Sequence, residues 1–148
     1  MQYFPKRKLI LPEGFSVDSE EIPPAKSINK LLANCSSDFF SNEKLFKAIQ
    51  KSNFFFTIFS KPKSEIHGFV RVTSDKGLNA NLWNLCAEPG KHQNLFYLVL
   101  LRLALERINR EMPGCSISVQ APPSSLESLE ESGFILDPNG IRVMGYKI

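Results

Sequence analysis

Apolar residues change their spacing along the chain, and these changes divide it into short strands and amphipathic helices. Continuous or alternating apolar runs of a few residues are typical of strands, and clusters of proline, glycine and polar residues separate such runs. The run at 54–59 consists of aromatic and β-branched residues, which indicates a strand buried on both faces. The pattern predicts five strands, over 15–18, 54–59, 66–74, 81–87 and 116–121, and two more, over 134–136 and 141–147, joined by a turn at 137–140.

Apolar residues three and four positions apart predict helices in four other segments. Residues 25–35 and 41–51 have this spacing and precede the first long strand. A longer helix occupies the apolar stretch 95–110. Ser124 and Glu127 have the spacing of a capping box, which predicts a short helix before the last two strands.

The stretch from Ala80 to Ala121 contains a strand, a tight polar loop, the long helix and a second strand. This order is that of a right-handed βαβ crossover, so the two strands should be parallel neighbours. A crevice at the carboxyl ends of such strands, capped by the amino end of the helix, is a common site for anionic ligands. The loop from Glu88 to Tyr97 lies there and is the first candidate for a binding site.

Composition is that of an ordinary globular protein. The 148 residues suit one domain over 1–148, with 43% hydrophobic and 22% charged residues. Residues 1–14 carry two prolines among scattered basic residues and predict an arm without a core of its own. The 18 basic and 15 acidic residues give a net charge of +3 and form no stripe, so we expect no nucleic-acid binding.

The cysteines and the length of the longest apolar run argue against a disulfide-bonded, metal-binding or membrane protein. Cys35, Cys86 and Cys115 form an odd set without close spacing, which suggests neither a disulfide framework nor a metal site. The apolar run at 95–105 is shorter than a membrane span and contains Arg102. We therefore expect no metal, no membrane association and a cytoplasmic location.

Several motifs add detail to the element order. They are Gly-Phe-Val-Arg-Val-Thr-Ser-Asp at 68–75, Leu-Asn-Ala-Asn-Leu-Trp-Asn-Leu at 78–85, Glu88-Pro89, Gly133-Phe134 and Asp-Pro-Asn-Gly-Ile-Arg-Val-Met at 137–144. Together they resemble the GNAT N-acetyltransferase superfamily, in particular the plastid and cyanobacterial branch that includes plant serotonin N-acetyltransferases. The resemblance implies an α+β fold of three layers (the α/β GNAT fold), with a mixed, mostly antiparallel sheet around a central parallel strand pair.

The resemblance also implies acetyl-CoA as a co-substrate, held where the fourth and fifth strands splay apart. Backbone groups of Leu85, Cys86 and Ala87 would contact its pantetheine arm. The family's diphosphate loop corresponds to His92, Gln93, Asn94, Leu95, Phe96 and Tyr97. Leu95 and Tyr97 stand where the family has two glycines, and their side chains add bulk beside the phosphate path. We therefore expect weaker or altered cofactor binding; alternatively, residues 91–94 are only a solvated loop.

The expected chemistry departs from the family pattern as well. Amine acetylation needs a base for the amine and an acid near the sulfur of the thioester. The tyrosine that the family supplies as acid is Leu129 here, and the acidic residue that follows the strand tryptophan in the related branch is Asn84. The remaining catalytic candidates are Glu88 as base and Ser128 as hydroxyl donor, although solvated loop and helix residues would have the same appearance.

Two hypotheses follow. The first is an acyl-CoA-dependent N-acyltransferase that acetylates a small-molecule or peptide amine by direct attack in a ternary complex. The second is a catalytically degenerate GNAT-fold protein that acts as a cofactor- or protein-binding module. The altered glycine positions, Leu129 and Asn84 favour the second, and the retained motifs favour the first. Either hypothesis is compatible with a homodimer.

Overall fold

One sheet of five strands organises the described part of the chain, residues 8–35, 39–61 and 65–147 of the computed structural model. Its order is β1 (Phe15–Asp18), β2 (Phe54–Ser60), β3 (Ile66–Ser74), β4 (Asn79–Ala87) and β5 (Ser116–Val119). The first four strands are antiparallel neighbours, and β5 runs parallel to β4. The predicted mixed sheet, mostly antiparallel with one parallel pair, is confirmed.

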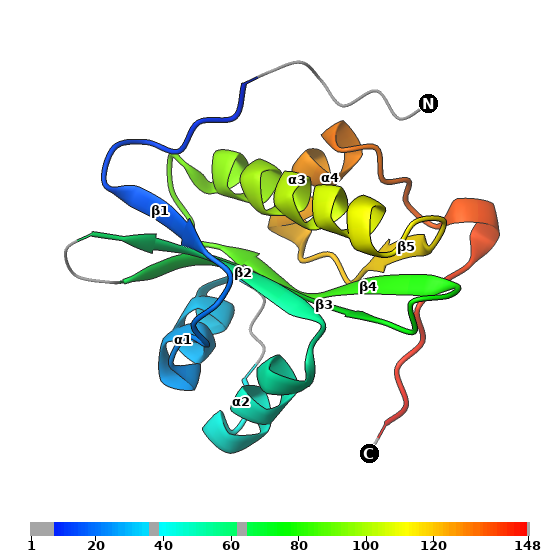
Figure 1. Ribbon diagram of the computed structural model, residues 1–148, viewed down its shortest axis with the longest axis horizontal. Helices are drawn as coiled ribbons and strands as arrows, with labels where there is room; N and C mark the ends of the chain where they lie inside the picture. Colours follow the sequence, from blue (N-terminus) through cyan, green and yellow to red (C-terminus); the bar gives the residue numbers. More distant parts are fainter. Residues whose placement is uncertain (1–7, 36–38, 62–64, 148) are drawn as a thin grey trace.

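Helices cover both faces of the sheet and give three layers (Figure 1). On one face lie α1 (Ala25–Cys35) and α2 (Asn42–Lys51), and on the other lie α3 (Gln93–Glu111) and α4 (Leu126–Glu131). At the start of α2 the Ser41 hydroxyl accepts a hydrogen bond from the backbone N–H of Lys44 at 3.3 Å. The predicted helices 25–35 and 41–51 are thus confirmed.

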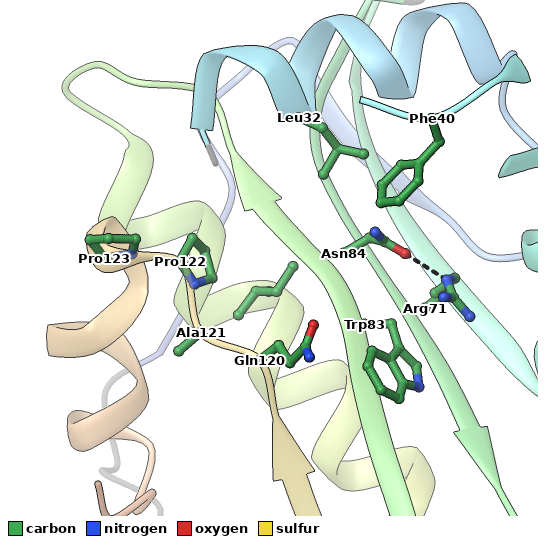
Figure 2. A pocket seen from close by; sticks show the side chains of 10 residues that line it. Leu32, Phe40, Arg71, Trp83, Asn84, Gln120, Ala121, Pro122 and Pro123 are labelled. Carbon is green, nitrogen blue, oxygen red and sulfur yellow. Dashed lines mark hydrogen bonds between the residues drawn. The ribbon is translucent and has the colours of Figure 1, made fainter. Parts of the chain in front are cut away.

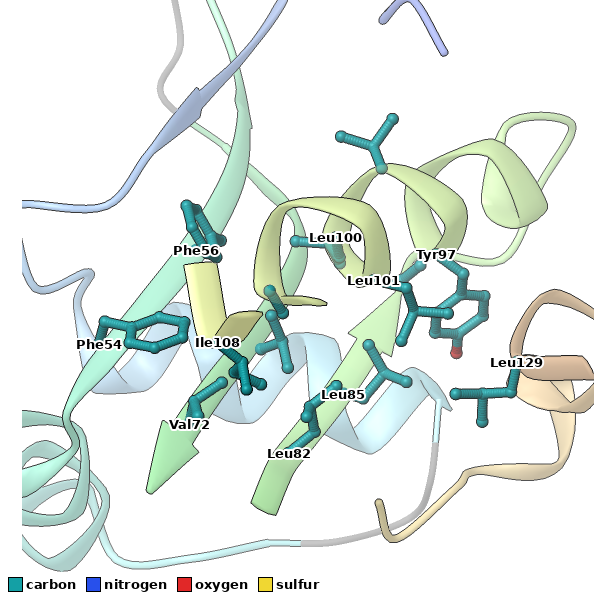
Figure 3. Packing of buried hydrophobic residues seen from close by; sticks show 14 of the residues in the cluster. Phe54, Phe56, Val72, Leu82, Leu85, Tyr97, Leu100, Leu101, Ile108 and Leu129 are labelled. Atoms are coloured by element: carbon teal, nitrogen blue, oxygen red, sulfur yellow. The ribbon is translucent and has the colours of Figure 1, made fainter. Parts of the chain in front are cut away.

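Side-chain alternation along the strands divides the apolar residues between two cores. The α3 core joins the sheet to α3 and α4 (Figure 3), and it includes Phe54, Phe56, Val72, Leu82, Leu85, Tyr97, Leu100, Leu101, Ile108 and Leu129. The α1–α2 core lies on the opposite face, and its buried residues are Ile28, Leu31, Leu32, Leu45, Ile49, Phe55, Phe69 and Cys86. The arm also contributes, because Leu9 and Leu11 pack against the α3 core.

The last two predicted strands, over 134–136 and 141–147, are wrong. The described residues after α4 contain no strand, only a short 3₁₀ helix η2 (Pro138–Gly140) with left-handed backbone at Asp137 (φ 46°) and Asn139 (φ 57°). These conformations bend the chain away from a two-stranded hairpin. Phe134 packs partly against the α3 core, but the apolar side chains after it stay in solvent, and Met144 is 91% exposed. The parallel pair β4–β5 therefore lies at the edge of the sheet in the described residues, not at its centre.

The predicted capping box is also wrong. A 3₁₀ turn, η1 (Pro123–Ser125), precedes α4, and Ser125 occupies the cap position without a side-chain cap hydrogen bond. The Ser124 hydroxyl bonds Tyr97 instead. Moreover, β5 ends at Val119 and not at 121. Both differences arise where the chain leaves the sheet at Pro122-Pro123.

Candidate functional site

The parallel strands β4 and β5 separate after four paired residues. They pair from Asn79 with Ser116 to Leu82 with Val119. Beyond this point β4 continues to Ala87, whereas the chain after Val119 leaves the sheet. A cavity of about 510 Å³ adjoins the separated segments (Figure 2). The predicted divergence of the two strands is confirmed.

The cavity wall comes from both sheet faces and from the connection after β5. Its lining residues are Leu32, Phe40, Arg71, Trp83, Asn84, Leu85, Gln120, Ala121, Pro122 and Pro123. A β-bulge explains why the successive β4 residues Trp83, Asn84 and Leu85 all take part. Arg71 pairs with Trp83 and Phe69 pairs with Cys86, so β4 carries one extra residue there, and Asn84 has φ 54°.

Arg71 is the single charged residue in this lining. Its Nε donates to Asn84 Oδ1 at 2.6 Å, and its Nη1 donates to Ser52 Oγ at 3.4 Å. The guanidinium carbon lies 5.8 Å from the centroid of the Trp83 ring. Partial burial lowers the pKa of Arg71. Every partner is uncharged, and among the described residues no carboxylate lies within ion-pair distance of this guanidinium.

Apolar side chains complete the wall opposite the strands. Leu32 comes from α1, and Phe40 precedes α2 (Figure 2). Asn29, buried in α1, fixes the Phe40 backbone, because Nδ2 donates to the Phe40 carbonyl at 2.7 Å and Oδ1 accepts from its N–H at 3.1 Å. The Trp83 indole is also fixed, since Nε1 donates to Thr73 Oγ1 at 2.7 Å. The cavity therefore has ordered aromatic walls.

Tyr97 closes the gap between strands on the α3 side. Its side chain is fully buried in the α3 core, and its phenol oxygen lies 2.7 Å from Ser124 Oγ. Ser124 follows Pro123 of the cavity wall, and the Ala87 backbone amide also bonds the phenol. Burial raises the pKa of Tyr97, whereas the Ser124 hydrogen bond opposes this rise. The ring thus spans from the end of β4 to the connection between β5 and α4.

The other predicted donor-binding residues lie around the amino end of α3. The Ala87 carbonyl accepts from Cys35 Sγ at 3.0 Å and from Gln93 Nε2 at 3.0 Å. Burial raises the pKa of the Cys86 thiol well above its ordinary value, which disfavours the reactive thiolate form there. His92 directly precedes the helix, with Asn94 and Leu95 in its first turn. Phe96 is buried beneath His92, with ring centroids 5.8 Å apart.

The two catalytic candidates lie outside the cavity lining. Glu88 follows β4, and its Oε2 lies 2.5 Å from His67 Nδ1. Ser128 is buried in α4, and its hydroxyl donates to the Asn94 carbonyl at 3.5 Å. Leu85 is the single predicted donor-binding residue that lines the cavity. The catalytic roles of Glu88 and Ser128 remain predictions.

His67 extends the Glu88 contact into a hydrogen-bonded row, because its Nε2 lies 2.9 Å from Ser60 Oγ. The order of acid, imidazole and hydroxyl is the one that activates a nucleophilic serine in hydrolases. The Ser60 N–H, however, donates to the Glu65 carbonyl at 2.9 Å and is not available to an oxyanion. The row ties the ends of β2, β3 and β4 together.

The cavity and the amino end of α3 have the chemistry to hold two parts of acetyl-CoA, and the Tyr97 side chain lies between these two places. The apolar and amide lining of the cavity suits an acyl group, and the amino end of α3, which has no side-chain cap hydrogen bond, suits a diphosphate. A linear donor that joins these two places has to pass the Tyr97 ring. A donor that occupied both places would therefore require this side chain to move.

Leu85 apart, sequence reasoning assigned none of the lining residues to the site, and Phe40, Arg71 and Gln120 are examples. A signal was present for Arg71, since it is a lone charge inside the apolar strand pattern Phe-Val-Arg-Val. A charge at such a position needs partners or a ligand. No comparable signal marks Gln120, which enters the wall because β5 ends early.

Among the described residues, no group of three or more His, Cys, Asp or Glu side chains could hold a metal ion. No helix in that part of the chain combines the length and apolarity needed to cross a membrane.

Curated proteins provide the sequence comparison. No protein-family model matches the chain. An uncharacterized N-acetyltransferase, ycf52, from Pyropia yezoensis is 27% identical over 99 residues, covering 66% of this chain and 56% of that protein. The ycf52 protein of Gracilaria tenuistipitata var. liui is 31% identical over 87 residues, covering 55% and 44%. The matches thus span about half the length of these relatives.

Solved structures share the fold at low identity. A probable acetyltransferase from Staphylococcus aureus superposes with a TM-score of 0.78 at 17% identity, covering 90% of this chain and 99% of that one. Glucosamine-6-phosphate N-acetyltransferase from Arabidopsis thaliana has a TM-score of 0.64 at 13% identity, with the same coverage of 90% and 99%. The chain therefore has the fold of the GNAT acetyltransferases, and part of its sequence is similar to the ycf52 N-acetyltransferases of red algae.

Proposed function

We propose that the protein is an acyl-CoA-dependent N-acyltransferase that acetylates an amine in a ternary complex. The observation that carries this proposal is the cavity where β4 and β5 diverge. The ycf52 relatives and the solved neighbours, which are named acetyltransferases, support the same class of activity. A small-molecule or peptide amine would be the acceptor.

Acetyl-CoA would supply a thioester carbonyl for direct attack by the amine. The contribution of the chain is mainly binding and orientation. Backbone groups of β4 at 85–87 and the first turn of α3 would hold the donor. Trp83, Phe40 and Leu32 would pack against the acceptor and exclude water, while Arg71 and Asn84 supply polar contacts.

A cofactor- or protein-binding module is the second candidate. One observation favours it, namely that the cavity lining contains no carboxylate, imidazole, thiol or phenol that could serve as base or acid. The Tyr97 ring across the donor path agrees with this alternative. Thiolate is a fair leaving group without an acid, however, so the lining does not by itself exclude transfer.

Titration of the purified protein with acetyl-CoA in a calorimeter, followed by thiol-release assays with a panel of primary amines, tests the proposal. Saturable binding together with amine-dependent release of free CoA supports the transferase. Binding without release over the whole panel supports the binding module. No heat and no release at high acetyl-CoA concentration contradicts the proposed function.

The transfer rate is expected to rise about tenfold per pH unit up to the pKa of the acceptor amine, because the cavity offers no base. Measured kcat/KM between pH 6 and 10 checks this, with Glu88→Gln as the matched variant. Glu88 lies outside the cavity lining, so the variant should give the same profile. A plateau well below the pKa of the acceptor, lost in Glu88→Gln, would instead assign the base to Glu88.

A further inference from the structure

The charge of Arg71 has no counter-charge in the cavity that it lines. Its Nε and Nη1 bond two neutral oxygens, Asn84 Oδ1 and Ser52 Oγ. A guanidinium has five N–H groups, so three remain for a further acceptor. Within the described residues, the four ion pairs involve other basic side chains, namely His67, Arg107, Arg110 and Arg142.

Removing an arginine partly from water without a carboxylate is unfavourable unless another anion compensates. The guanidinium is also held in place, by Asn84 at 2.6 Å and by the Trp83 ring at 5.8 Å. A fixed fork of N–H donors beside a cavity is the geometry that recognises a carboxylate with two parallel hydrogen bonds. An anionic group of the ligand would supply the missing charge.

We infer that Arg71 binds a carboxylate of the acceptor, so that the acceptor is an amine that also carries a carboxylate, such as an apolar amino acid. The apolar body of such a ligand matches Leu32, Phe40 and Trp83. The inference rests on the proposed transferase function, because the ligand is an acceptor only if the protein transfers an acyl group to it. The carboxylate site itself can be tested without any catalysis.

Trp83 provides the readout, because it is the single tryptophan of the chain and lines the cavity. Its fluorescence is titrated with phenylacetate and with phenylacetamide, which have similar shapes and differ in charge. We expect phenylacetate to bind roughly 10- to 100-fold more tightly, the range for hydrogen bonds to a charged group. Equal affinities, or no saturable change with phenylacetate, overturn the inference.

Two variants remove the free charge in different ways. Arg71→Gln deletes it, and Asn84→Asp places a carboxylate against it at the position of an existing 2.6 Å hydrogen bond. Aspartate also tolerates the left-handed backbone at this position, φ 54°, so the second variant should fold normally. Each variant should bring the phenylacetate preference close to one, whereas Arg110→Gln, which removes an exposed charge outside the cavity lining, should keep it. A preference that survives in both charge variants overturns the inference.

Transfer assays with acetyl-CoA separate this inference from the proposed function. L-phenylalanine is compared with L-phenylalaninamide as acceptor, and we expect the amino acid to have the higher kcat/KM by roughly tenfold. Transfer without this preference overturns the inference and leaves the transferase standing. Phenylacetate selectivity without transfer to any amine contradicts the transferase and leaves an anion-binding site at Arg71.

Discussion

Replacing Tyr97 with alanine is expected to strengthen acetyl-CoA binding roughly 30-fold. In the wild-type protein a donor has to displace a buried ring and its 2.7 Å hydrogen bond to Ser124. Burial of the ring contributes about 1.5–3 kcal/mol, and the hydrogen bond contributes about 0.5–1.5 kcal/mol. Displacing both therefore reduces the apparent binding free energy of the donor by at least about 2 kcal/mol. Calorimetric titration of both proteins with acetyl-CoA measures the difference.

The same substitution removes a fully buried aromatic side chain from the α3 core, which should lower the free energy of unfolding by about 3–5 kcal/mol. Tyr97→Phe is the matched control, since it keeps the ring and loses the hydrogen bond. It should strengthen binding by no more than about tenfold. A folded Tyr97→Ala protein that binds acetyl-CoA no better than wild type would mean that the ring does not obstruct the donor.

Local patterns predicted the elements that pack on the sheet and misjudged the carboxyl-terminal segment. The aromatic run of β2 and the helical spacing of α1 predict which of their residues are buried, and both elements form as expected. Apolar and polar residues alternate in the segment 141–147 as in a strand, yet this segment forms no strand. Alternation reports which face a strand would bury, but not whether a neighbouring strand is there to pair with. The two left-handed residues in 137–140 could not be read from turn chemistry alone.

The site was predictable in outline for a similar reason. A crossover of this length predicts β4 and β5 as parallel neighbours with a crevice at their carboxyl ends, and the family resemblance added that the two strands splay apart there. The cavity wall did not follow, because it depends on a bulge at Asn84 and on the early end of β5. Asn84 was recognised only as a residue that cannot act as a base. Its contact with Arg71 gives it another meaning, since a neutral amide there leaves the guanidinium uncompensated.

Phe69→Ala is expected to lower the free energy of unfolding by about 3–5 kcal/mol and to weaken ligand binding in the cavity. Phe69 is fully buried at the centre of the α1–α2 core, with its ring stacked on Phe55 at 6.3 Å between centroids. This core fixes α1 to the sheet, and α1 carries Leu32 of the cavity wall. Urea unfolding and the Trp83 fluorescence titration with phenylacetate measure the two effects.

Phe39→Ala is the matched control, because it removes the same ring from a position that is 78% exposed. Its effect on the free energy of unfolding should stay within about 0.5 kcal/mol. If Phe69→Ala is strongly destabilised but binds phenylacetate as wild type does, the cavity wall does not depend on how α1 packs against the sheet. In that case the strands β3 and β4, with Arg71, Trp83 and Asn84, would suffice to form the binding surface, and the helical layer would serve stability alone.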